Sequence, residues 1–355
     1  YFGLSNSLQT AQAAGGAGGA VGGWVELART TLGSANTDIA VTSLADKRYY
    51  MILGHSQGYG SAVSNFAHRL NADTGSNYSS RQNQNGGADA LWTNNTRIQQ
   101  SKSAVGNSGA FNVGYLANLS GKEKLMILHT SEFGGTGAGT APVSRKEIVG
   151  KHAQTTNPIS SYTWSNYQGT DTFPTGSEVV VLGWDPADTH TSNFWEELLD
   201  ETITSTTAHT TSTFTTKKYL WIQIYCKGKS SADTFRLEFG NATVDTGTNY
   251  SVRHNYNGTT ESANTSTDHW NMEGANTSDP SFHNIFMINN ASNEKLGIMH
   301  NVQQSTAGAG TAPNRREQVA KWTNTSNQIN IMKMYTTGGS STIDTGSRIK
   351  VWGAN

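Results

Sequence analysis

Residues 73–86 read DTGSNYSSRQNQNG and residues 245–258 read DTGTNYSVRHNYNG, so one stretch of this chain occurs twice. Ten positions are identical at an offset of 172. The match extends in both directions, with the pairs Trp24–Leu27 and Trp195–Leu198, Lys47–Tyr49 and Lys217–Tyr219, Glu123–His129 and Glu294–His300, Gly137–Pro142 and Gly308–Pro313, and Thr175–Ser177 and Thr345–Ser347. Because the offset stays between 170 and 172, we interpret the chain as a tandem duplication of one domain.

The duplication sets the expected domain organisation of the 355 residues. Each copy has about 160 residues, which is enough to bury its own core. The predicted segments are an arm with a Gly/Ala tether over 1–23, a first repeat over 24–185, a linker over 186–194 and a second repeat over 195–355.

The composition favours β-structure and excludes some partners. The formal net charge is -1 and only 14% of residues are charged, so we expect no nucleic-acid partner. Hydrophobic residues make up 35%, and a chain otherwise rich in Gly, Ser, Thr and Asn is typical of strands joined by tight turns. No run of 18 apolar residues exists, so we expect no membrane partner. The single cysteine, Cys226, allows no intrachain disulfide, which fits a reducing compartment slightly better.

Short apolar runs with period-two alternation indicate strands of five to eight residues, separated by turns. We therefore predict an all-β fold of two tandem antiparallel β-sandwiches, jelly-roll-like, with eight to ten strands each. Phe194–Thr204 looks helical by propensity. Its repeat-mate 23–33 contains residues that favour a strand, so we predict a strand there too.

The N-terminal arm is predicted to be an assembly element. Tyr1, Phe2, Leu4 and Leu8 are apolar groups outside either repeat, and a tether of Gly and Ala follows them. A disordered terminus is the alternative. The chain starts at Tyr1 rather than Met and shows no signal peptide, so we expect a processed terminus or a numbering that starts later.

Gly54-His55-Ser56-Gln57-Gly58 matches the G-x-S-x-G nucleophile elbow and follows an apolar run. Residues 63–70 alternate like a strand, whereas the elbow needs a helix there. The repeat-mate of Ser56 is Cys226, which leaves the second copy without a serine nucleophile. We interpret the motif as a hairpin turn with an inert Ser56, and keep a serine esterase as a remote alternative.

Other polar motifs are predicted to be structural. Asp73 and Asp245 open the repeated loop and should cap it locally, with bound calcium as the lesser alternative. His129 and His300 fall at predicted strand ends and should be structural or half-exposed. Gly228-Lys229-Ser230 lacks the first glycine of a P-loop. We expect no catalytic residue, no metal and no cofactor.

Two tryptophans are candidates for stacking on sugars. Trp92 and Trp270 lie in Gly- and Asn-rich surroundings that suggest exposure, although ordinary packing is the favoured interpretation.

The phrases DTGSNY (73–78), GKEKL (121–125), GAGTAP (137–142) and TGSEVVVLGW (175–184) resemble tandem-repeat virion structural proteins of marine viruses, chiefly tailed phages. The resemblance covers both repeats but not the arm. It implies a structural part of a particle, such as a capsid decoration, spike or tail fibre, and it transfers no site residues.

Three hypotheses about function follow. The first is a non-enzymatic virion structural protein that forms homo-oligomers, a trimer among them, and contacts other virion proteins. It would assemble in the host cytoplasm and be extracellular in the mature particle. The second is a carbohydrate-binding or adhesive surface module, with a host-surface glycan as partner. The third is the esterase that uses Ser56.

Overall fold

The structure is a computed structural model that describes residues 23–58, 65–101, 109–168, 171–188, 192–259, 261–273 and 278–355. The predicted assembly residues Tyr1, Phe2, Leu4 and Leu8 lie outside the described residues, so the role of the arm stays a prediction.

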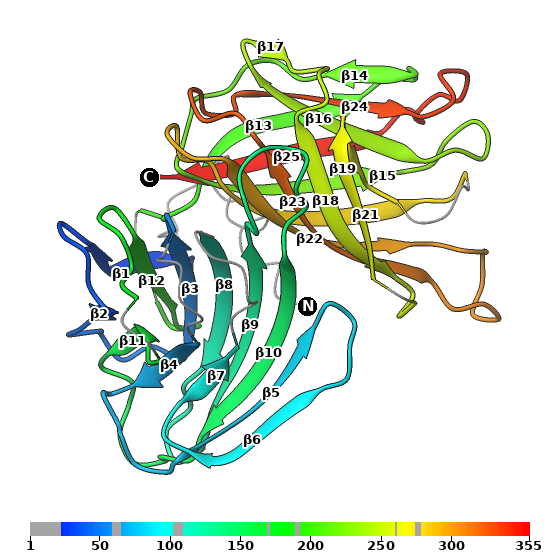
Figure 1. Cartoon of the computed structure of the whole chain (residues 1–355). Coiled ribbons are helices and arrows are strands. Elements are labelled where there is room, and N and C mark those ends of the chain that lie inside the picture. Colours follow the sequence, from blue (N-terminus) through cyan, green and yellow to red (C-terminus); the bar gives the residue numbers. More distant parts are fainter. Residues whose placement is uncertain are drawn as a thin grey trace. The chain divides into compact units, whose positions relative to one another are not determined.

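The first repeat forms two antiparallel sheets. The larger has eight strands in the order β1-β12-β3-β8-β9-β10-β5-β6, and the smaller has the order β2-β11-β4-β7 (Figure 1). The strands are β1 (Val25–Thr31), β2 (Asp38–Val41), β3 (Tyr49–Ser56), β4 (Phe66–Leu70), β5 (Tyr78–Gln84), β6 (Ala90–Asn95), β7 (Ile98–Gln100), β8 (Ala110–Ala117), β9 (Lys124–Glu132), β10 (Ser144–His152), β11 (Tyr162–Asn166) and β12 (Glu178–Trp184).

The second repeat has the corresponding sheets, β13-β25-β15-β21-β22-β23-β18-β19 and β14-β24-β16-β17, with β20 paired to β16. Its strands are β13 (Glu196–Ile203), β14 (Ala208–Thr210), β15 (Tyr219–Cys226), β16 (Phe235–Asn241), β17 (Thr243–Val244), β18 (Tyr250–Tyr256), β19 (Ser262–Thr267), β20 (Trp270–Asn271), β21 (Ser281–Ile288), β22 (Lys295–Gln303), β23 (Asn314–Trp322), β24 (Ile331–Thr336) and β25 (Ser347–Ala354).

The eight-stranded sheets have the same strand order when repeat-mates are matched, which confirms the predicted all-β fold of two similar sandwich-like halves. Irregularities are duplicated as well. The register of β1 against β12 shifts between Glu26 and Ala28, and that of β13 against β25 shifts between Glu197 and Leu199. The strand predicted within Phe194–Thr204 is confirmed as β13. No helix among the described residues is long and apolar enough to cross a membrane.

Each repeat has its own hydrophobic core between its two sheets. In the first repeat Met126, Leu128 and Ile148 point into a cluster that includes Trp164 and Phe66. The corresponding cluster of the second repeat is the larger of the two and contains Trp270 and Trp322. Alternation along the strands therefore leaves the residues between these core positions on the opposite face of each long sheet.

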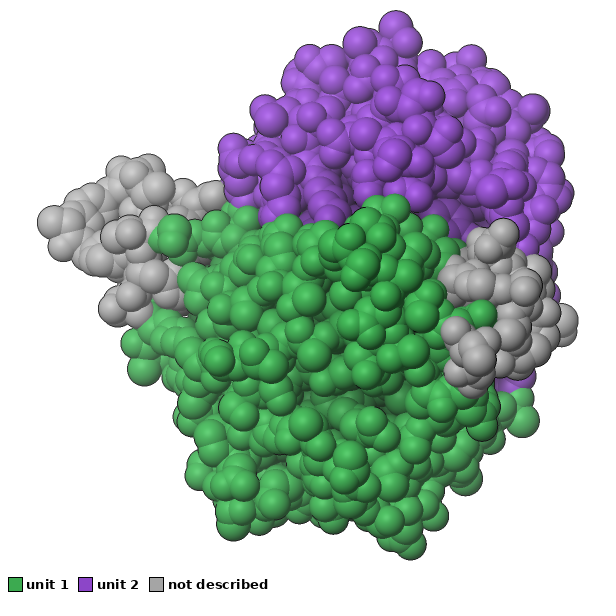
Figure 2. Space-filling model, turned by 60° about the vertical axis from the view of Figure 1, so that its left-hand side comes forward, with its two compact units in different colours: residues 1–83, 88–129, 146–195 green, residues 84–87, 130–145, 196–355 purple. Residues whose placement is uncertain are grey.

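The described residues fall into two compact units (Figure 2). Unit 1 comprises residues 1–83, 88–129 and 146–195, and unit 2 comprises 84–87, 130–145 and 196–355. Unit 2 thus includes residues 130–145, which belong to the first repeat by sequence. The domain boundaries expected from the sequence stay a prediction.

The connection after Ser56 differs from the predicted hairpin. Strands β3 and β4 lie in different sheets, so they do not form a hairpin. Gly54 serves the contact between the sheets, because a Cβ there would lie 3.3 Å from the ring of Trp164 on β11. The hairpin interpretation is therefore wrong, since alternation locates strands but not the sheet that each one joins.

Unit 2 contains a buried ion pair that no sequence motif indicates. The ammonium of Lys229 lies 2.5 Å from the carboxylate of Glu273, and both side chains have no exposed surface. Glu273 also accepts hydrogen bonds from the Ser281 hydroxyl at 2.6 Å and the Phe235 amide at 3.3 Å. Burial raises the pKa of Glu273, and Lys229 acts in the opposite direction. Lys229 and Glu273 thus belong to a buried polar network inside unit 2. This agrees with the prediction that Lys229 is not part of a phosphate-binding loop.

We expect Lys229→Met to lower the free energy of unfolding by about 3–5 kcal/mol, because it leaves the Glu273 carboxylate buried without its cation. The double variant Lys229→Met/Glu273→Gln should recover most of that loss, since an amide can replace the carboxylate without a charge. Urea denaturation of the three proteins measures this. A double variant no more stable than the single one would contradict it.

Acid should destabilise unit 1 through His68. This buried ring lies 2.8 Å from the Gln100 side-chain oxygen, and burial lowers its pKa to about 4. Below the ordinary pKa of about 6.5, the unfolded chain binds a proton that the folded chain does not, so stability falls by about 1.4 kcal/mol per pH unit until the folded pKa is reached. Urea midpoints at pH 7, 6 and 5 should decline less steeply in His68→Gln. Equal slopes would show that His68 does not contribute.

Candidate functional site

The repeated Asp-Thr-Gly loop of the first copy is held by its own side chains. The Asp73 carboxylate accepts hydrogen bonds from the Gly75 amide at 2.7 Å and from the Asn77 amide group at 2.8 Å. The Nε2 atom of His152 on β10 lies 2.7 Å from the carboxylate oxygen that also accepts from Asn77, and this contact is the main reason that the pKa of Asp73 falls below its usual range. Tyr78 donates to the Leu70 carbonyl oxygen beneath the loop.

The second copy repeats this arrangement with a different ring. Asp245 accepts from the Gly247 amide at 2.9 Å and the Asn249 side chain at 3.0 Å, and the indole N–H of Trp322 donates to it at 2.8 Å. Local capping is thereby confirmed. Both oxygens of each carboxylate face hydrogen-bond donors, which is the wrong environment for a calcium ion.

Ser56 and Cys226 occupy equivalent positions, as the alignment predicts. Each is the last residue of its strand and each is fully buried. The Ser56 hydroxyl donates to the Gly58 carbonyl oxygen at 2.7 Å, and the Cys226 thiol lies 3.2 Å from the Gly228 carbonyl oxygen. Burial raises the pKa of Cys226 to about 12. Both side chains therefore stabilise a turn, and neither presents a nucleophile to solvent.

The two candidate sugar-stacking tryptophans differ in the structure. Trp270 has no exposed surface, and its ring packs edge-on against Phe239 at 4.7 Å in the core, so stacking on a sugar is wrong for this residue. Its Gly/Asn-rich neighbours suggested exposure, but they are turns beside a core position. Trp92 is half-buried on strand β6, and its proposed role stays a prediction.

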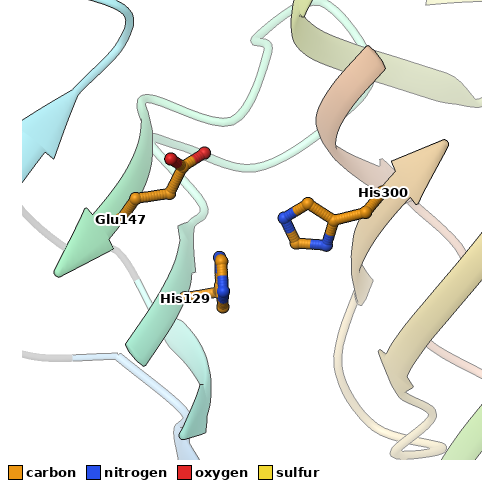
Figure 3. Close-up of side chains that lie close together, drawn as sticks. All are labelled: His129, Glu147 and His300. Carbon is orange, nitrogen blue, oxygen red and sulfur yellow. The ribbon is translucent and has the colours of Figure 1, made fainter. Parts of the chain in front are cut away.

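His129 and His300 lie within nine-residue strands, so the predicted position at strand ends is wrong, while the half-exposed state is confirmed. Figure 3 shows His129 on β9 and Glu147 on the neighbouring strand β10 of unit 1, and it also labels His300 on β22 of unit 2. One histidine and one glutamate within a unit are too few ligands to define a metal site. Burial, with Arg145 and Arg315 nearby, lowers the pKa of His300 to about 4, and such a positive surrounding disfavours a cation.

The outer face of unit 2 is the side of its long sheet that points away from the core. Three strands contribute three residues each, and the register places them in three rows. The rows are Ser251, Lys321 and Leu296; Arg253, Val319 and Ile298; and Asn255, Glu317 and His300. Leu296, Ile298 and Val319 are buried, although none of them belongs to the core between the sheets. Another part of unit 2 must therefore cover this face.

The cover is the first loop, residues 130–145. Its backbone carbonyl oxygens at Gly135, Thr140 and Pro142 accept hydrogen bonds, in that order, from Lys321 at 2.7 Å, from Ser251 at 3.1 Å and from Arg253 at 2.6 Å. In addition, the Gly137 amide donates to Glu294, and the amide of Ser266 donates to the Ala138 carbonyl oxygen at 2.8 Å. The outer face thus binds mainly the backbone of the loop.

Arg145 at the end of the first loop forms the charged part of the contact. Its guanidinium donates to Glu317 at 2.8 Å and to Glu261 at 3.1 Å. Lys321 also lies 3.1 Å from Glu294 and its side chain has no exposed surface. Burial lowers the pKa of Lys321, and the nearby Glu294 partly offsets that effect. Since buried charges need partners, these ion pairs fix the position of the loop.

All nine residues of the outer face are identical in the first repeat. The corresponding outer face of unit 1 consists of Ser79, Arg81 and Asn83 on β5, Leu125, Ile127 and His129 on β9, and Glu147, Val149 and Lys151 on β10. Its apolar residues Leu125, Ile127 and Val149 are 57%, 41% and 49% exposed, whereas their mates in unit 2 are at most 4% exposed. The apolar part of this face is thus covered in unit 2 and open in unit 1, which is what the term open outer face means below.

The second loop, residues 301–315, is the repeat-mate of the first. It carries the same Gly-Ala-Gly-Thr-Ala-Pro sequence, and every residue from Thr306 to Pro313 is exposed. In the first loop Gly137, Ala138 and Ala141 are half-buried and Pro142 is buried. One copy of the loop therefore lies on a face, and the other projects into solvent.

The strands and loops that make up this site carry repeated sequences, but no motif in them marks an interface. On three strands every second residue is identical in the two repeats, while the residues between them differ, as Met126 and Gly297 do. Identity on one side of a sheet alone indicates that this surface is the same in both repeats, beyond what a shared fold requires. The partner of each face depends on three-dimensional position and has no sequence signal.

No protein-family model matches the chain, and no curated protein sequence matches it. Similar solved structures include domains LG4-5 of the mouse laminin alpha1 chain, with 10% identity and a TM-score of 0.21 over 93% of this chain and 89% of that chain. Another is the exo-inulinase of Aspergillus awamori, with 9% identity and a TM-score of 0.32 over 93% and 98%. Similarity at these TM-scores carries no argument about function.

Arg145 and Arg315 offer a matched pair of substitutions. Arg145→Gln should lower the free energy of unfolding by about 2–4 kcal/mol, because it leaves Glu261 and Glu317 without their shared buried cation. Arg315, its mate on the second loop, also pairs with Glu317, but its side chain is 54% exposed, so Arg315→Gln should change stability by only about 0.5 kcal/mol. Chemical denaturation compares the two. Equal losses would contradict the difference between a covered and an open loop.

Proposed function

We propose that this protein is a non-enzymatic, self-assembling structural component built from two β-sandwich repeats. The observation that carries the proposal is the open outer face of unit 1. Leu125, Ile127 and Val149 form an exposed apolar group on neighbouring strands, ringed by the charged side chains of Arg81 and Lys151. An exposed apolar patch with a polar rim is typical of a protein interaction surface.

The resemblance to virion structural proteins of marine viruses supports the setting of a viral particle. In that setting the partners are further copies of the chain and other virion proteins, and the position is a capsid decoration, spike or tail fibre. The protein would assemble in the host cytoplasm and be extracellular in the mature particle. The trimer and the assembly role of the N-terminal arm belong to the same proposal.

A carbohydrate-binding module is the second candidate, favoured by a groove on unit 2. The groove has a volume of about 320 Å³ and is lined by the rings of Tyr225 and Phe282 beside Gln304, Ser305 and Thr306. Exposed aromatic rings next to amide and hydroxyl groups suit the apolar faces and hydroxyls of a sugar. Binding on a glycan array that is lost in Tyr225→Ala would support this candidate.

The esterase alternative has no support in the geometry of its nucleophile. Ser56 is buried, and its hydroxyl donates to a backbone carbonyl oxygen.

Light scattering on the purified chain tests the proposed assembly. We expect a mass greater than one chain, rising with protein concentration, and ordered particles under the electron microscope. A single-chain mass at all concentrations would contradict the structural role. If specific glycan binding were found as well, the carbohydrate-binding module would be the better proposal.

A further inference from the structure

We infer that the second loop of one copy binds the open outer face of unit 1 in a second copy, repeating the contact that the first loop makes within unit 2. This inference rests on the proposed assembly role and names its contact. Both halves are present and exposed on each chain, namely residues 306–313 and the apolar group Leu125, Ile127 and Val149 on the outer face of unit 1.

The repeated turn of the second loop has the backbone shape that it has in the bound first loop. Gly308 has φ 89° where Gly137 has φ 81°, and both loops turn at the same places along their repeated sequence. The residues before this turn differ, because Gly134 and Gly135 have positive φ and their mates Ser305 and Thr306 do not. The base is anchored alike. The Asn257 side chain accepts from the Arg315 amide at 2.8 Å, as that of Asn85 accepts from the Arg145 amide at 2.8 Å. A loop held in its bound shape loses little conformational freedom on binding.

The open face carries the groups that hold the first loop in unit 2. Lys321 and Glu294 correspond to Lys151 and Glu123, which form an ion pair at 2.9 Å with side chains 45% and 41% exposed. Ser266, whose amide binds the first loop, corresponds to Asn94, and both residues have φ 49°. The open face therefore has the same hydrogen-bond donors and acceptors on a backbone of the same conformation.

Matching the two repeats gives each contact of the proposed interface. Lys151 would donate to the carbonyl oxygen of Thr306, and Glu123 would accept from the amide of Gly308. Ser79 would donate to the carbonyl oxygen of Thr311.

The charged end of the contact requires an exchange of partners. On the open face Arg81 pairs with Asp89 at 2.8 Å, with side chains 55% and 38% exposed. In unit 2 the mate of Arg81 binds a loop carbonyl oxygen, and the mate of Asp89, Glu261, binds Arg145. Arg81 would therefore turn to the Pro313 carbonyl oxygen. Asp89 would receive Arg315 of the arriving loop, which pairs with Glu317 of its own chain before binding.

Such a contact joins two different surfaces, so it is heterologous. Each chain offers one exposed loop and one exposed apolar group on its outer face, and every copy added leaves one of each at the ends. Successive copies then form a closed ring if the rotation between them closes, and an open filament if it does not.

Two matched substitutions test the face. Ile127→Glu on the open face should raise the apparent Kd of self-association by roughly tenfold or more, because it puts a charge at the centre of the contact. Leu119→Glu, at a site 47% exposed outside both that face and the second loop, should leave the Kd unchanged. Because both positions are exposed, circular dichroism should show that both variants fold.

Charge exchange tests the partner. Asp89→Arg and Arg315→Glu should each weaken assembly alone, and an equal mixture of the two proteins should restore it, since each loop then meets an opposite charge on another chain. Rescue by the double variant but not by the mixture would show that the loop binds its own chain, and would overturn the inference.

If neither variant affects an assembly that the wild-type chain forms, another surface is used, and the inference fails while the proposed function stands. A wild-type chain that stays single at all concentrations defeats both.

Discussion

The rest of this structure depends on how the outer face of each long sheet, the side away from the core, is kept from water. Alternation along β22 places Met299 in the core of unit 2, and it necessarily turns Leu296 and Ile298 the other way. A second apolar surface on a sheet lowers its free energy when another segment or a partner covers it. In unit 2 the first loop does so, and the corresponding apolar residues of unit 1 remain exposed.

The polar rim explains why a loop rich in Gly and Ala suits this face. Small side chains let the backbone come close, so that its carbonyl oxygens reach Lys321, Ser251 and Arg253. An ammonium group with no exposed surface is costly to desolvate, and a carbonyl oxygen together with the carboxylate of Glu294 offsets that cost. Contacts to backbone atoms depend on the conformation of the loop. That conformation needs glycine where φ is positive, as at Gly137 and Gly308, which explains why the loop sequence is the same in both repeats.

Most of the fold could be predicted from the sequence because its signals are local or duplicated. Alternation located the strands, and the repeat corrected the helical propensity of Phe194–Thr204. Pairing between sheets has no local signal, so the connection after Ser56 was misassigned. Burial of Trp270 depends on Phe239, a neighbour more than thirty positions away in sequence and packed against it through the fold. The site was visible only as identical alternate residues, and their meaning required knowing that three strands lie side by side.

Duplication of a domain that carries both a loop and a face for it has a geometric consequence. If the loop of one repeat binds the face of the next repeat along the chain, a two-repeat chain uses one loop and one face, and keeps one of each. Loss of contact by itself would let the unused copies diverge, because an exposed position tolerates most substitutions. Yet Arg81, Ile127 and Lys151 on the open face match their covered mates, as does the whole exposed Gly-Ala-Gly-Thr-Ala-Pro segment. Folding of unit 1 does not need this surface to be apolar and charged in the same pattern. Its identity with the covered face of unit 2 therefore supports the proposed use of the same contact between copies of the chain.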